Sequence, residues 1–183
     1  MEFEQVIRTR RTIRKFSDTK VSDELIQSLI DCAVRAPSSM NGQPWYFIVI
    51  REAETKNRLA EIKNKYCPIE KQGFSADFLL EAPVIVLTCV DRSRSYDREI
   101  ENGVLATGNL LLAAANYGLT SVYMSAYKTG TPEVADDIRT LLNIPADIDP
   151  ITLVPMGYPG GTPDPKTVKS VEEVIFNEAF GRK

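Results

Sequence analysis

A short segment near the start of the chain carries a dense cluster of positive charge. Within RTRRTIRKF, residues 8–16, five of the first eight residues are basic and none is acidic, although the whole chain has a net charge of -3. The basic residues are Arg8, Arg10, Arg11, Arg14 and Lys15. Guanidinium groups bind phosphate oxygens in a two-pronged geometry, and the hydroxyl of Thr12 adds a further donor or acceptor. The segment therefore predicts a ligand that carries phosphate.

Two other interpretations of this basic segment stay open. Its arginines can form a solvated face or pair with the acidic residues, which outnumber the basic ones by 25 to 22. The segment can also be an arm for nucleic acid, but binding of DNA or RNA usually requires a broad positive surface. Because the chain has a pI near 5.2, we expect no nucleic-acid partner.

A second segment, PSSMNGQPW at residues 37–45, is rich in uncharged hydrogen-bonding groups. Ser38, Ser39, Asn41 and Gln43 supply hydroxyls and amides, which suit the polar edge of a heterocycle better than a phosphate. The alternative is structural: the two serines satisfy the end of a helix, and Asn41 with the following glycine makes a turn. Loops often carry binding groups, so the segment is a candidate part of a ligand site.

Composition excludes several kinds of catalytic site. The chain has no histidine, which removes Ser-His-Asp triads, Cys-His dyads and HExxH zinc sites. The separate cysteines Cys32, Cys67 and Cys89 argue against a metal site and against a disulfide framework. No GxGxxG motif follows a strand pattern, so a Rossmann dinucleotide site has no support. If the protein is an enzyme, we expect a cofactor to carry its chemistry.

The apolar runs of the chain bear on its location. The N-terminal residues lack the apolar core of a signal peptide, and no stretch reaches the roughly 18 apolar residues of a membrane span. We therefore expect a cytoplasmic protein without membrane contact.

Hydrophobic patterning predicts the elements that position the two segments. A chain of 183 residues predicts one domain, over residues 1–183. Helices are expected near residues 3–7, 22–37, 53–65, 98–117 and from 131 onward. Strands are expected at residues 45–51, 84–90, 120–126 and 151–159, with a weaker strand signal at 171–176. The first two strands are predicted to be buried, the second at the centre of the sheet.

Individual residues mark several helix ends. Ser22 is expected to cap the second helix, and Gly118 to end the fourth. That fourth helix is apolar nearly all round, which predicts the core helix of the domain. Thr131 is expected to cap the last helix, with Pro132 at its first position. Because helices alternate with strands, the pattern alone favours a parallel α/β sheet.

The order of motifs resembles the FMN-dependent nitroreductase family over nearly the whole chain. The basic segment followed by APSSMNGQPWYFIVI is similar to the start of that family. GNLLLAAANYGLTSVYMSA resembles its long central helix and the next strand, and LLNIPADIDPITLVPMGYP resembles its Leu-x-Ile-Pro to Gly-Tyr-Pro stretch. Each motif alone is moderately specific, whereas the set in this order is a strong indication.

This resemblance implies an α+β fold in place of the parallel sheet. The expected architecture is a nitroreductase-like sandwich, with a mostly antiparallel central sheet flanked by helices. The resemblance also implies an intertwined homodimer with a large helical interface, flavin sites between the subunits, and C-terminal segments that exchange. In this chain the exchanged segment would be the tail at residues 166–183.

The resemblance further implies which residues bind FMN. Arg10 would bind the phosphate, with Arg11 beside it at the phosphate or ribityl end. Thr12 would contact the pyrimidine edge of the ring, and Arg14 would lie near N1 and O2. The loop residues that would complete the flavin site of the partner subunit are Pro37, Ser38, Ser39, Asn41 and Gln43.

Further contacts are implied in the second half of the chain. Ser125 and Ala126 lie where the family places a backbone amide near N5 or O4, and Gly157 also lies near the cofactor. Lys166 and Lys169 stand where an arginine is common in the family, and would approach the phosphate.

The implied activity is that of an oxidoreductase with no side-chain acid or base. NAD(P)H would enter as an exchanging substrate, and an electron-poor acceptor such as a nitroaromatic or a quinone would follow it in ping-pong order. Residues 66–82 match no motif and, by the resemblance, would help to shape the substrate pocket. The alternatives are a flavin-using dehalogenase, a flavin-breakdown enzyme of the same family, and a non-catalytic flavin-binding module.

Overall fold

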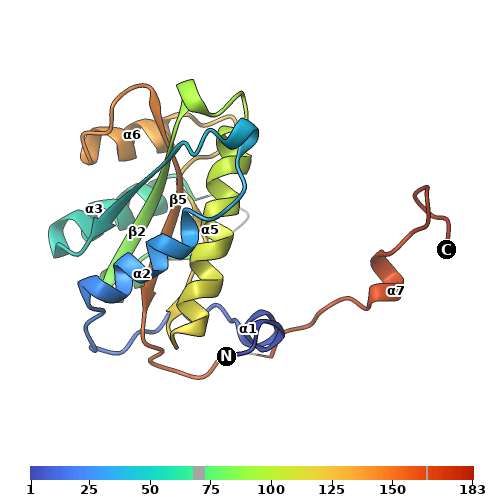
Figure 1. The fold of residues 1–183 in the computed structure, drawn as a ribbon. Coiled ribbons are helices and arrows are strands. Elements are labelled where there is room, and N and C mark those ends of the chain that lie inside the picture. The colour runs from blue at the N-terminus through green and yellow to red at the C-terminus, as the bar shows by residue number, and fades with distance from the viewer. Residues whose placement is uncertain (68–72, 164) are drawn as a thin grey trace.

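The computed structural model describes residues 1–67, 73–163 and 165–183 and shows helices packed on both faces of one five-stranded sheet (Figure 1). Its α-helices are α1 (Phe3–Thr9), α2 (Asp23–Ala33), α3 (Ala53–Lys65), α4 (Phe78–Glu81), α5 (Glu99–Asn116), α6 (Glu133–Leu141) and α7 (Val171–Val174). Its strands are β1 (Trp45–Ile50), β2 (Val84–Asp91), β3 (Thr120–Ser121), β4 (Met124–Ser125) and β5 (Ile148–Gly157). The 3-10 helices of the described residues, η1 (Ser39–Asn41) and η3 (Arg92–Arg94), lie before β1 and after β2.

The described strand pairs are all antiparallel, as the family resemblance implies, so the parallel sheet favoured by alternation is wrong. The strand order is β1-β2-β5-β3, and β4 also pairs with β5. The chain leaves β1 and enters β2 at the same end of the sheet, because Ile50 pairs with Ile85. Helical periodicity shows that the segment between two strands contains helices. It does not show whether that segment brings the chain back to the same end of the sheet, which decides whether the strands are antiparallel.

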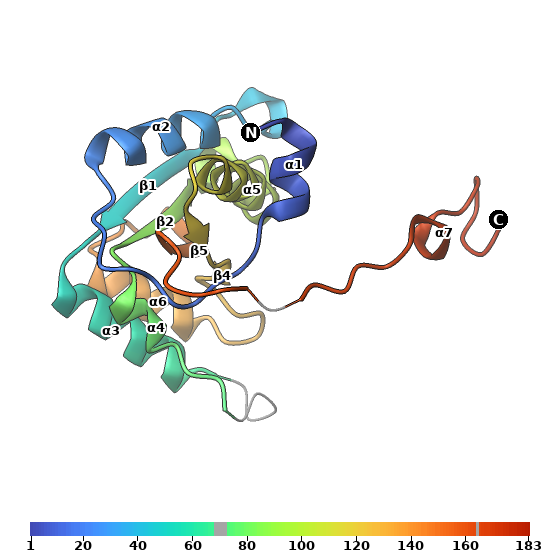
Figure 2. The same cartoon turned by 90° about the horizontal axis from the view of Figure 1, so that it is seen from below.

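Two layers of helices enclose the sheet (Figure 2). Alternate residues of β2 point into opposite layers, as strand geometry requires. Ile85, Leu87 and Cys89 pack with α3, α4 and α6, whereas Val84 and Val86 pack with α2 and α5. Because β2 is buried over almost its whole length, the predicted central strand is confirmed.

β1 is an edge strand, which corrects the prediction that residues 45–51 are buried. Its described ladder partner is β2 on one side. Tyr46 is 51% exposed and Val49 is 39% exposed. A β-branched and aromatic composition predicts a strand, but it does not reveal whether both edges of that strand are covered.

The third expected strand, residues 120–126, is divided into β3 and β4. Between and after these pieces, the amides of Val122 and Ala126 donate to β5 carbonyls at 3.1 and 2.9 Å. The segment therefore follows β5 as predicted, with an interruption at Val122 and Tyr123 that leaves the tyrosine exposed.

Most predicted helix ends are confirmed. The Ser22 hydroxyl accepts a backbone N–H at the start of α2, at 3.2 Å, and Gly118 ends α5 with a φ of 78°. α6 differs, because Pro132 itself occupies the cap position and no side chain caps the helix. Thr131 instead closes a turn, in which its amide donates to the carbonyl of Lys128 at 3.0 Å.

α5 approaches the sheet closely because its inner face carries small residues. A Cβ at Gly103 would lie 2.7 Å from a side-chain carbon of Ile151 on β5, so only glycine permits this distance. One turn later the buried Thr107 hydroxyl lies 2.6 Å from the Thr152 hydroxyl and 3.3 Å from that of Thr88. In the described part of the chain, no helix is both long enough and apolar enough to cross a membrane.

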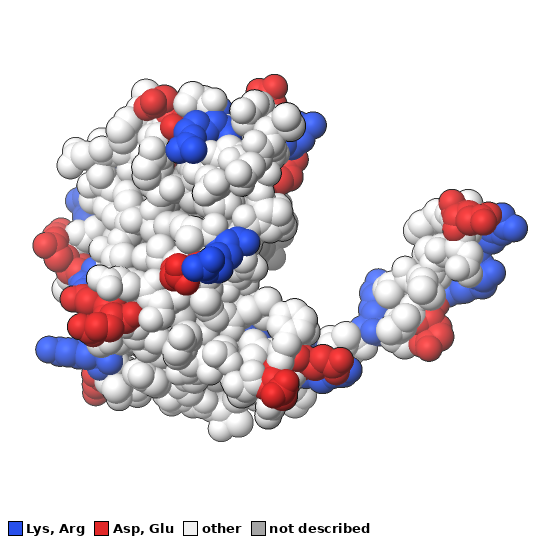
Figure 3. All heavy atoms as spheres, in the orientation of Figure 1, with Lys and Arg blue, Asp and Glu red and all other residues white. Residues whose placement is uncertain are grey.

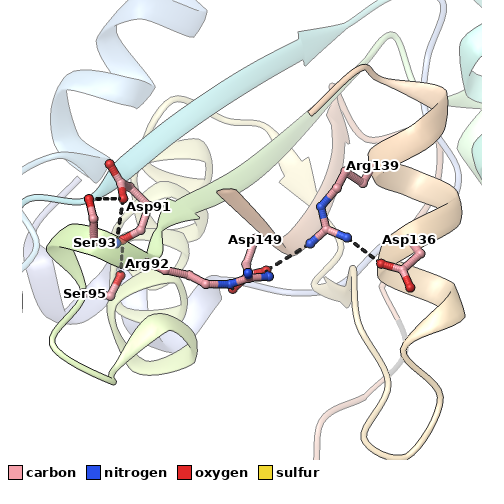
Figure 4. Close-up of polar contacts among 7 residues, drawn as sticks. All are labelled: Asp91, Arg92, Ser93, Ser95, Asp136, Arg139 and Asp149. Atoms are coloured by element: carbon pink, nitrogen blue, oxygen red, sulfur yellow. Dashed lines mark hydrogen bonds and ion pairs between the residues drawn. The ribbon is translucent and has the colours of Figure 1, made fainter. Parts of the chain in front are cut away.

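A charged network fastens α6 to the sheet (Figure 4). The Asp149 carboxylate on β5 accepts two hydrogen bonds from Arg92, one of them at 2.7 Å, and one from Arg139 of α6 at 3.0 Å. Arg139 also donates to Asp136. Because Arg139 and Asp149 are largely shielded from water, this network is screened less than a surface ion pair.

The C-terminal residues 171–176 begin as a helical turn, so the weak strand signal there is wrong. Ser170 and Glu173 form a capping box at the start of α7, and this local device favours a helix. The tail runs away from the rest of the chain (Figure 1) and exposes apolar side chains, with Val168 71% and Phe180 94% exposed.

Candidate functional site

The basic segment leaves α1 and runs along the end of the sheet as an extended chain. The amide of Ile13 donates to the hydroxyl of Thr120 at 3.1 Å. The amide of Gly160 donates to the carbonyl of Lys15 at 2.9 Å. A Cβ at Gly160 would lie 2.6 Å from the carbonyl oxygen of Phe16, so the glycine allows the two backbones to meet.

Two hollows open along this segment. The first, which we call the arginine cleft, has a volume of about 170 Å³ and is lined by Arg10, Arg11 and the C-terminal end of α5. The second, which we call the aromatic cavity, has a volume of about 530 Å³ and includes Arg14. Its aromatic lining residues are Tyr66, Phe74, Phe78, Tyr123 and Tyr127.

The wall of the aromatic cavity is held by polar contacts. The Arg14 guanidinium lies 5.7 Å from the centre of the Phe78 ring, a distance at which cation–π attraction acts. The Lys63 ammonium donates to the carbonyl of Ser125 at 2.7 Å, and both residues line the cavity. The amide of Ala126 donates to a β5 carbonyl at 2.9 Å, and Ala126 is not among the lining residues of the cavity.

The loop at residues 37–43 adopts a strained backbone. Met40, Asn41 and Gln43 have φ values of 49°, 55° and 47°, in the left-handed region that asparagine tolerates and other side chains avoid. Such residues cost roughly 1 to 3 kcal/mol each and persist where the surroundings enforce them, commonly at functional sites. At Gly42, a Cβ would lie 2.0 Å from the carbonyl oxygen of Arg94, so the loop must pass close to η3.

Asn102, in the first turn of α5, holds this loop in place. Its side-chain oxygen accepts from the amide of Ser39 at 2.9 Å, and its side-chain nitrogen donates to the carbonyl of Ser95 at 3.1 Å. Its own carbonyl accepts from the Trp45 indole at 2.8 Å. Asn102 is not among the residues predicted from the sequence. An asparagine within an apolar helical pattern could have indicated it, because a buried amide needs hydrogen-bond partners.

The basic segment and the loop lie at opposite ends of α5 (Figure 1). The loop contacts Asn102 near the N-terminus of the helix, whereas the arginine cleft includes Ala115 near its C-terminus. With 18 residues at about 1.5 Å per residue, α5 is roughly 27 Å long. One chain therefore does not bring the two predicted halves of the site together.

Most of the remaining residues predicted to bind FMN lie outside the two hollows. Thr12 is exposed and lines neither hollow. Gly157 is buried, and a Cβ at this position would lie 2.6 Å from the side chain of Pro83, so the close packing requires glycine. Lys166 and Lys169 are exposed on the tail and line neither hollow. Of residues 66–82, positions 66, 67, 74 and 78 line the aromatic cavity, and 68–72 lie outside the described residues.

We expect Asn102→Ala to destabilise the protein and release the loop. The substitution removes the partners of two backbone groups, and leaving buried polar groups unpaired costs about 1 to 3 kcal/mol each. Urea unfolding measures the stability, and amide hydrogen exchange at Ser39 measures the loop. Gln27→Ala, at an exposed residue of α2, is the control and should change neither. Unchanged protection of the Ser39 amide in Asn102→Ala would contradict this role.

Comparison with known proteins gives the family of the chain. The model of the nitroreductase family matches residues 7–158. A relative from Methanothermobacter thermautotrophicus, provisionally named an NADH dehydrogenase/NAD(P)H nitroreductase, is 33% identical over 165 residues, which cover 89% of this chain and 80% of the relative.

Solved structures give the same result. A Parabacteroides distasonis protein with the same provisional name superposes with a TM-score of 0.84 at 29% identity, covering 97% of this chain and 98% of the other. An oxidised iodotyrosine deiodinase bound to FMN and 3-iodo-L-tyrosine superposes with a TM-score of 0.80 at 29% identity, covering 97% and 98%. With a family match over most of its length, the chain belongs to the nitroreductase family.

Proposed function

We propose that the protein passes electrons from NAD(P)H, through bound FMN, to an electron-poor acceptor such as a nitroaromatic or a quinone. The observation that carries this proposal is the path of the basic segment. One extended stretch presents Arg10 and Arg11 at a small cleft and Arg14 at a larger aromatic cavity.

Membership of the family supports the general activity of the protein. The chain belongs to the nitroreductase family, and its relatives include proteins named as NAD(P)H nitroreductases and a deiodinase solved with FMN. It is therefore an NAD(P)H-dependent FMN oxidoreductase. We further propose the class of electron acceptor, the residues that bind FMN and the assembly of two subunits.

The residues present fit FMN. The described residues that line the arginine cleft include two guanidiniums and no carboxylate, which suits a phosphate group. The aromatic cavity, at about 530 Å³, falls in the usual range of ligand pockets and suits a planar ring. Arg10 and Arg14 are four residues apart, so an extended segment separates them by up to about 13 Å. One segment can thus contact both ends of a mononucleotide.

Bound FMN would supply the redox chemistry, accepting hydride from NAD(P)H and giving it to the acceptor that follows in ping-pong order. The protein supplies position and charge. Arg14 places a positive charge at the cavity, where it stabilises negative charge that develops during electron transfer. Lys63 fixes the carbonyl of Ser125, and with it the β4 wall of the cavity. The aromatic side chains exclude water from the reacting groups.

A second copy of the chain would complete the site. An antiparallel crossing of two α5 helices places the N-terminal end of one beside the C-terminal end of the other. The loop at residues 37–43 of each chain then approaches the arginine cleft of its partner. Pro37, Ser38, Ser39, Asn41 and Gln43 would serve the flavin there, which is the role proposed for them from the family.

Gly108 marks the crossing point on α5. It lies at the middle of the helix, and a Cβ there would meet nothing within 4 Å in this chain. Glycine inside a helix costs about 1 kcal/mol of stability relative to alanine. No neighbour within the chain requires a glycine at this position, so we infer that another molecule approaches it closely. In a two-fold dimer a residue at the centre meets its own copy. Figure 3 shows that the face along which α5 runs is largely free of charged side chains.

The tail and β1 also point to a dimer. Residues 165–183 extend away from the chain that carries them, and their apolar side chains are exposed (Figure 1). β1 has a free edge among the described residues and exposes Tyr46 and Val49. We propose that the tail packs on the partner subunit, which removes both apolar surfaces from water.

A dehalogenase is the second candidate, because one of the similar structures holds 3-iodo-L-tyrosine. Release of iodide from that amino acid by the reduced protein would favour this activity over nitro reduction. A protein that binds FMN tightly but has negligible turnover with any acceptor would instead be a flavin-binding module.

The first experiment is an absorption spectrum of the purified, dialysed protein, followed by anaerobic addition of NADH and then NADPH. We expect flavin bands that bleach on addition of one or both nucleotides, and recover when a nitroaromatic or a quinone is added. A colourless protein that neither binds added FMN nor gains heat stability from it would contradict the proposed function.

We expect Arg14→Ala to slow reduction by NAD(P)H by about tenfold to a hundredfold, which corresponds to the loss of one hydrogen bond to a charged group. Stopped-flow measurement on the FMN-loaded variant gives the rate, and flavin fluorescence gives the FMN affinity. Arg8→Ala is the matched control, because Arg8 is exposed on α1 and lines neither hollow. An unchanged rate in the loaded Arg14 variant would overturn this role.

We expect Gly108→Arg to give a folded monomer that binds FMN poorly. The chain itself has space for the side chain, whereas a crossing helix would clash with it. Analytical ultracentrifugation reports the assembly, circular dichroism the fold, and fluorescence the FMN affinity. Thr140→Arg, which adds the same charge to an exposed residue of α6, should remain dimeric. A dimeric Gly108→Arg that binds FMN normally would remove α5 from the interface.

A further inference from the structure

The aromatic cavity carries several positive charges. Among the described lining residues three are basic, namely Arg14, Lys63 and Lys128, and none carries a carboxylate. A hollow lined by one sign of charge raises the local concentration of ligands with the opposite sign. The cavity is therefore selective for charge as well as for shape.

Two of these cations belong to elements other than the basic segment. Lys63 lies on α3, and Lys128 lies in the connection between β4 and α6. α3 belongs to the helical layer that Figure 2 shows below the sheet, and the connection leads into α6 of the same layer. Lys63 is bonded to the carbonyl of Ser125. Lys128 is not among the residues that we propose for FMN, so it can serve the molecules that enter after the cofactor.

The contact of Lys128 leaves its charge directed at the cavity. The Lys128 ammonium donates to the carbonyl of Tyr66 at 3.4 Å, and within the described chain it forms no ion pair. The nearby Lys65 lies outside the cavity lining and is paired with Asp137 at 3.0 Å. A carbonyl does not cancel a positive charge as a carboxylate does, so the field of Lys128 reaches the cavity.

Aromatic rings form the rest of the wall. Phe74 and Phe78 pack edge to face, with ring centres 6.4 Å apart. Three tyrosines add further ring surface around the same space: Tyr66, Tyr123 and Tyr127. Aromatic ligands gain from stacked and edge-to-face contacts with such walls. The cavity thus offers ring contacts and cationic groups to the same ligand.

We propose that the aromatic cavity selects acceptors that are aromatic anions, with a carboxylate or similar group on the ring that carries the reducible group. Lys128 is the specificity-determining residue. The inference rests on the proposed function and names the substrate class of that site. For a nitroaromatic carboxylate, NAD(P)H and one proton convert the nitro group to a nitroso group. The products are the oxidised nicotinamide and water, and two electrons pass in total.

The test uses a matched pair of acceptors, para-nitrobenzoate and para-nitrobenzamide, with FMN-loaded protein. The ratio of their kcat/KM values is compared between wild type and Lys128→Gln, because intrinsic differences in reduction potential cancel in that comparison. We expect the ratio to fall by up to about fivefold in the variant, the range for one partly exposed charge pair. Lys20→Gln, outside the cavity, should keep the wild-type ratio.

Salt and simple binding give readouts that do not depend on turnover. Raising the salt concentration from 0.1 M to 1 M shortens the screening length from about 10 Å to about 3 Å, so the preference for the carboxylate should shrink in wild type. Calorimetry should show benzoate binding more tightly than benzamide to FMN-loaded wild type, and this difference should decrease in Lys128→Gln.

The outcomes separate this inference from the proposed function. Absence of flavin binding and of nucleotide-driven bleaching would overturn the proposed function itself. FMN-loaded protein that reduces both acceptors with the same ratio in wild type and in Lys128→Gln would overturn the inference alone. A rise in KM for NADPH but not NADH, with an unchanged acceptor ratio, would assign Lys128 to the nucleotide phosphate and would also overturn it.

Discussion

The close contact between α5 and β5 is the constraint on which the rest of this structure depends. The missing side chain at Gly103 lets the helix approach Ile151, and one turn later the hydroxyls of Thr107 and Thr152 meet at 2.6 Å inside the core. Polar side chains in such a place hold one arrangement, because a shift of the helix would leave them unpaired. The position of α5 then sets where both of its ends lie, and each end supports part of the candidate site.

This arrangement gives α5 two roles. One face completes the core of the chain, while the opposite face has open space at Gly108. The N-terminal end holds a strained loop through Asn102, and the C-terminal end borders the arginine cleft. Because the helix is rigid and long, the two ends cannot approach each other within one chain. In the dimer that we propose, two copies of α5 cross in opposite directions and join these ends, and the two-fold axis passes through their crossing point.

Charge is organised on a finer scale than the net charge of the chain. Although the chain is acidic overall, basic residues cluster along one extended segment and around one cavity, and a neighbouring lysine, Lys65, is paired with Asp137. Three residues with left-handed backbone, Met40, Asn41 and Gln43, lie within one loop, although Tyr96, Asp97, Asn143 and Glu178 also have positive φ. The basic segment and this loop are the surfaces that we propose for binding, where strain and charge commonly serve a ligand.

The sequence by itself determined the local features. Ser22, Gly118 and the apolar run of β2 act through neighbouring residues, so periodicity and capping signals identified them. The motifs also indicated the family, and with it the antiparallel sheet that alternation alone misjudged. Only the tertiary structure decided the strand order, the edge position of β1, the role of Asn102 and the cations around the aromatic cavity. These depend on contacts between residues far apart in the chain, such as Ser39 with Asn102 or Lys63 with Ser125. No local pattern encodes which distant groups will meet.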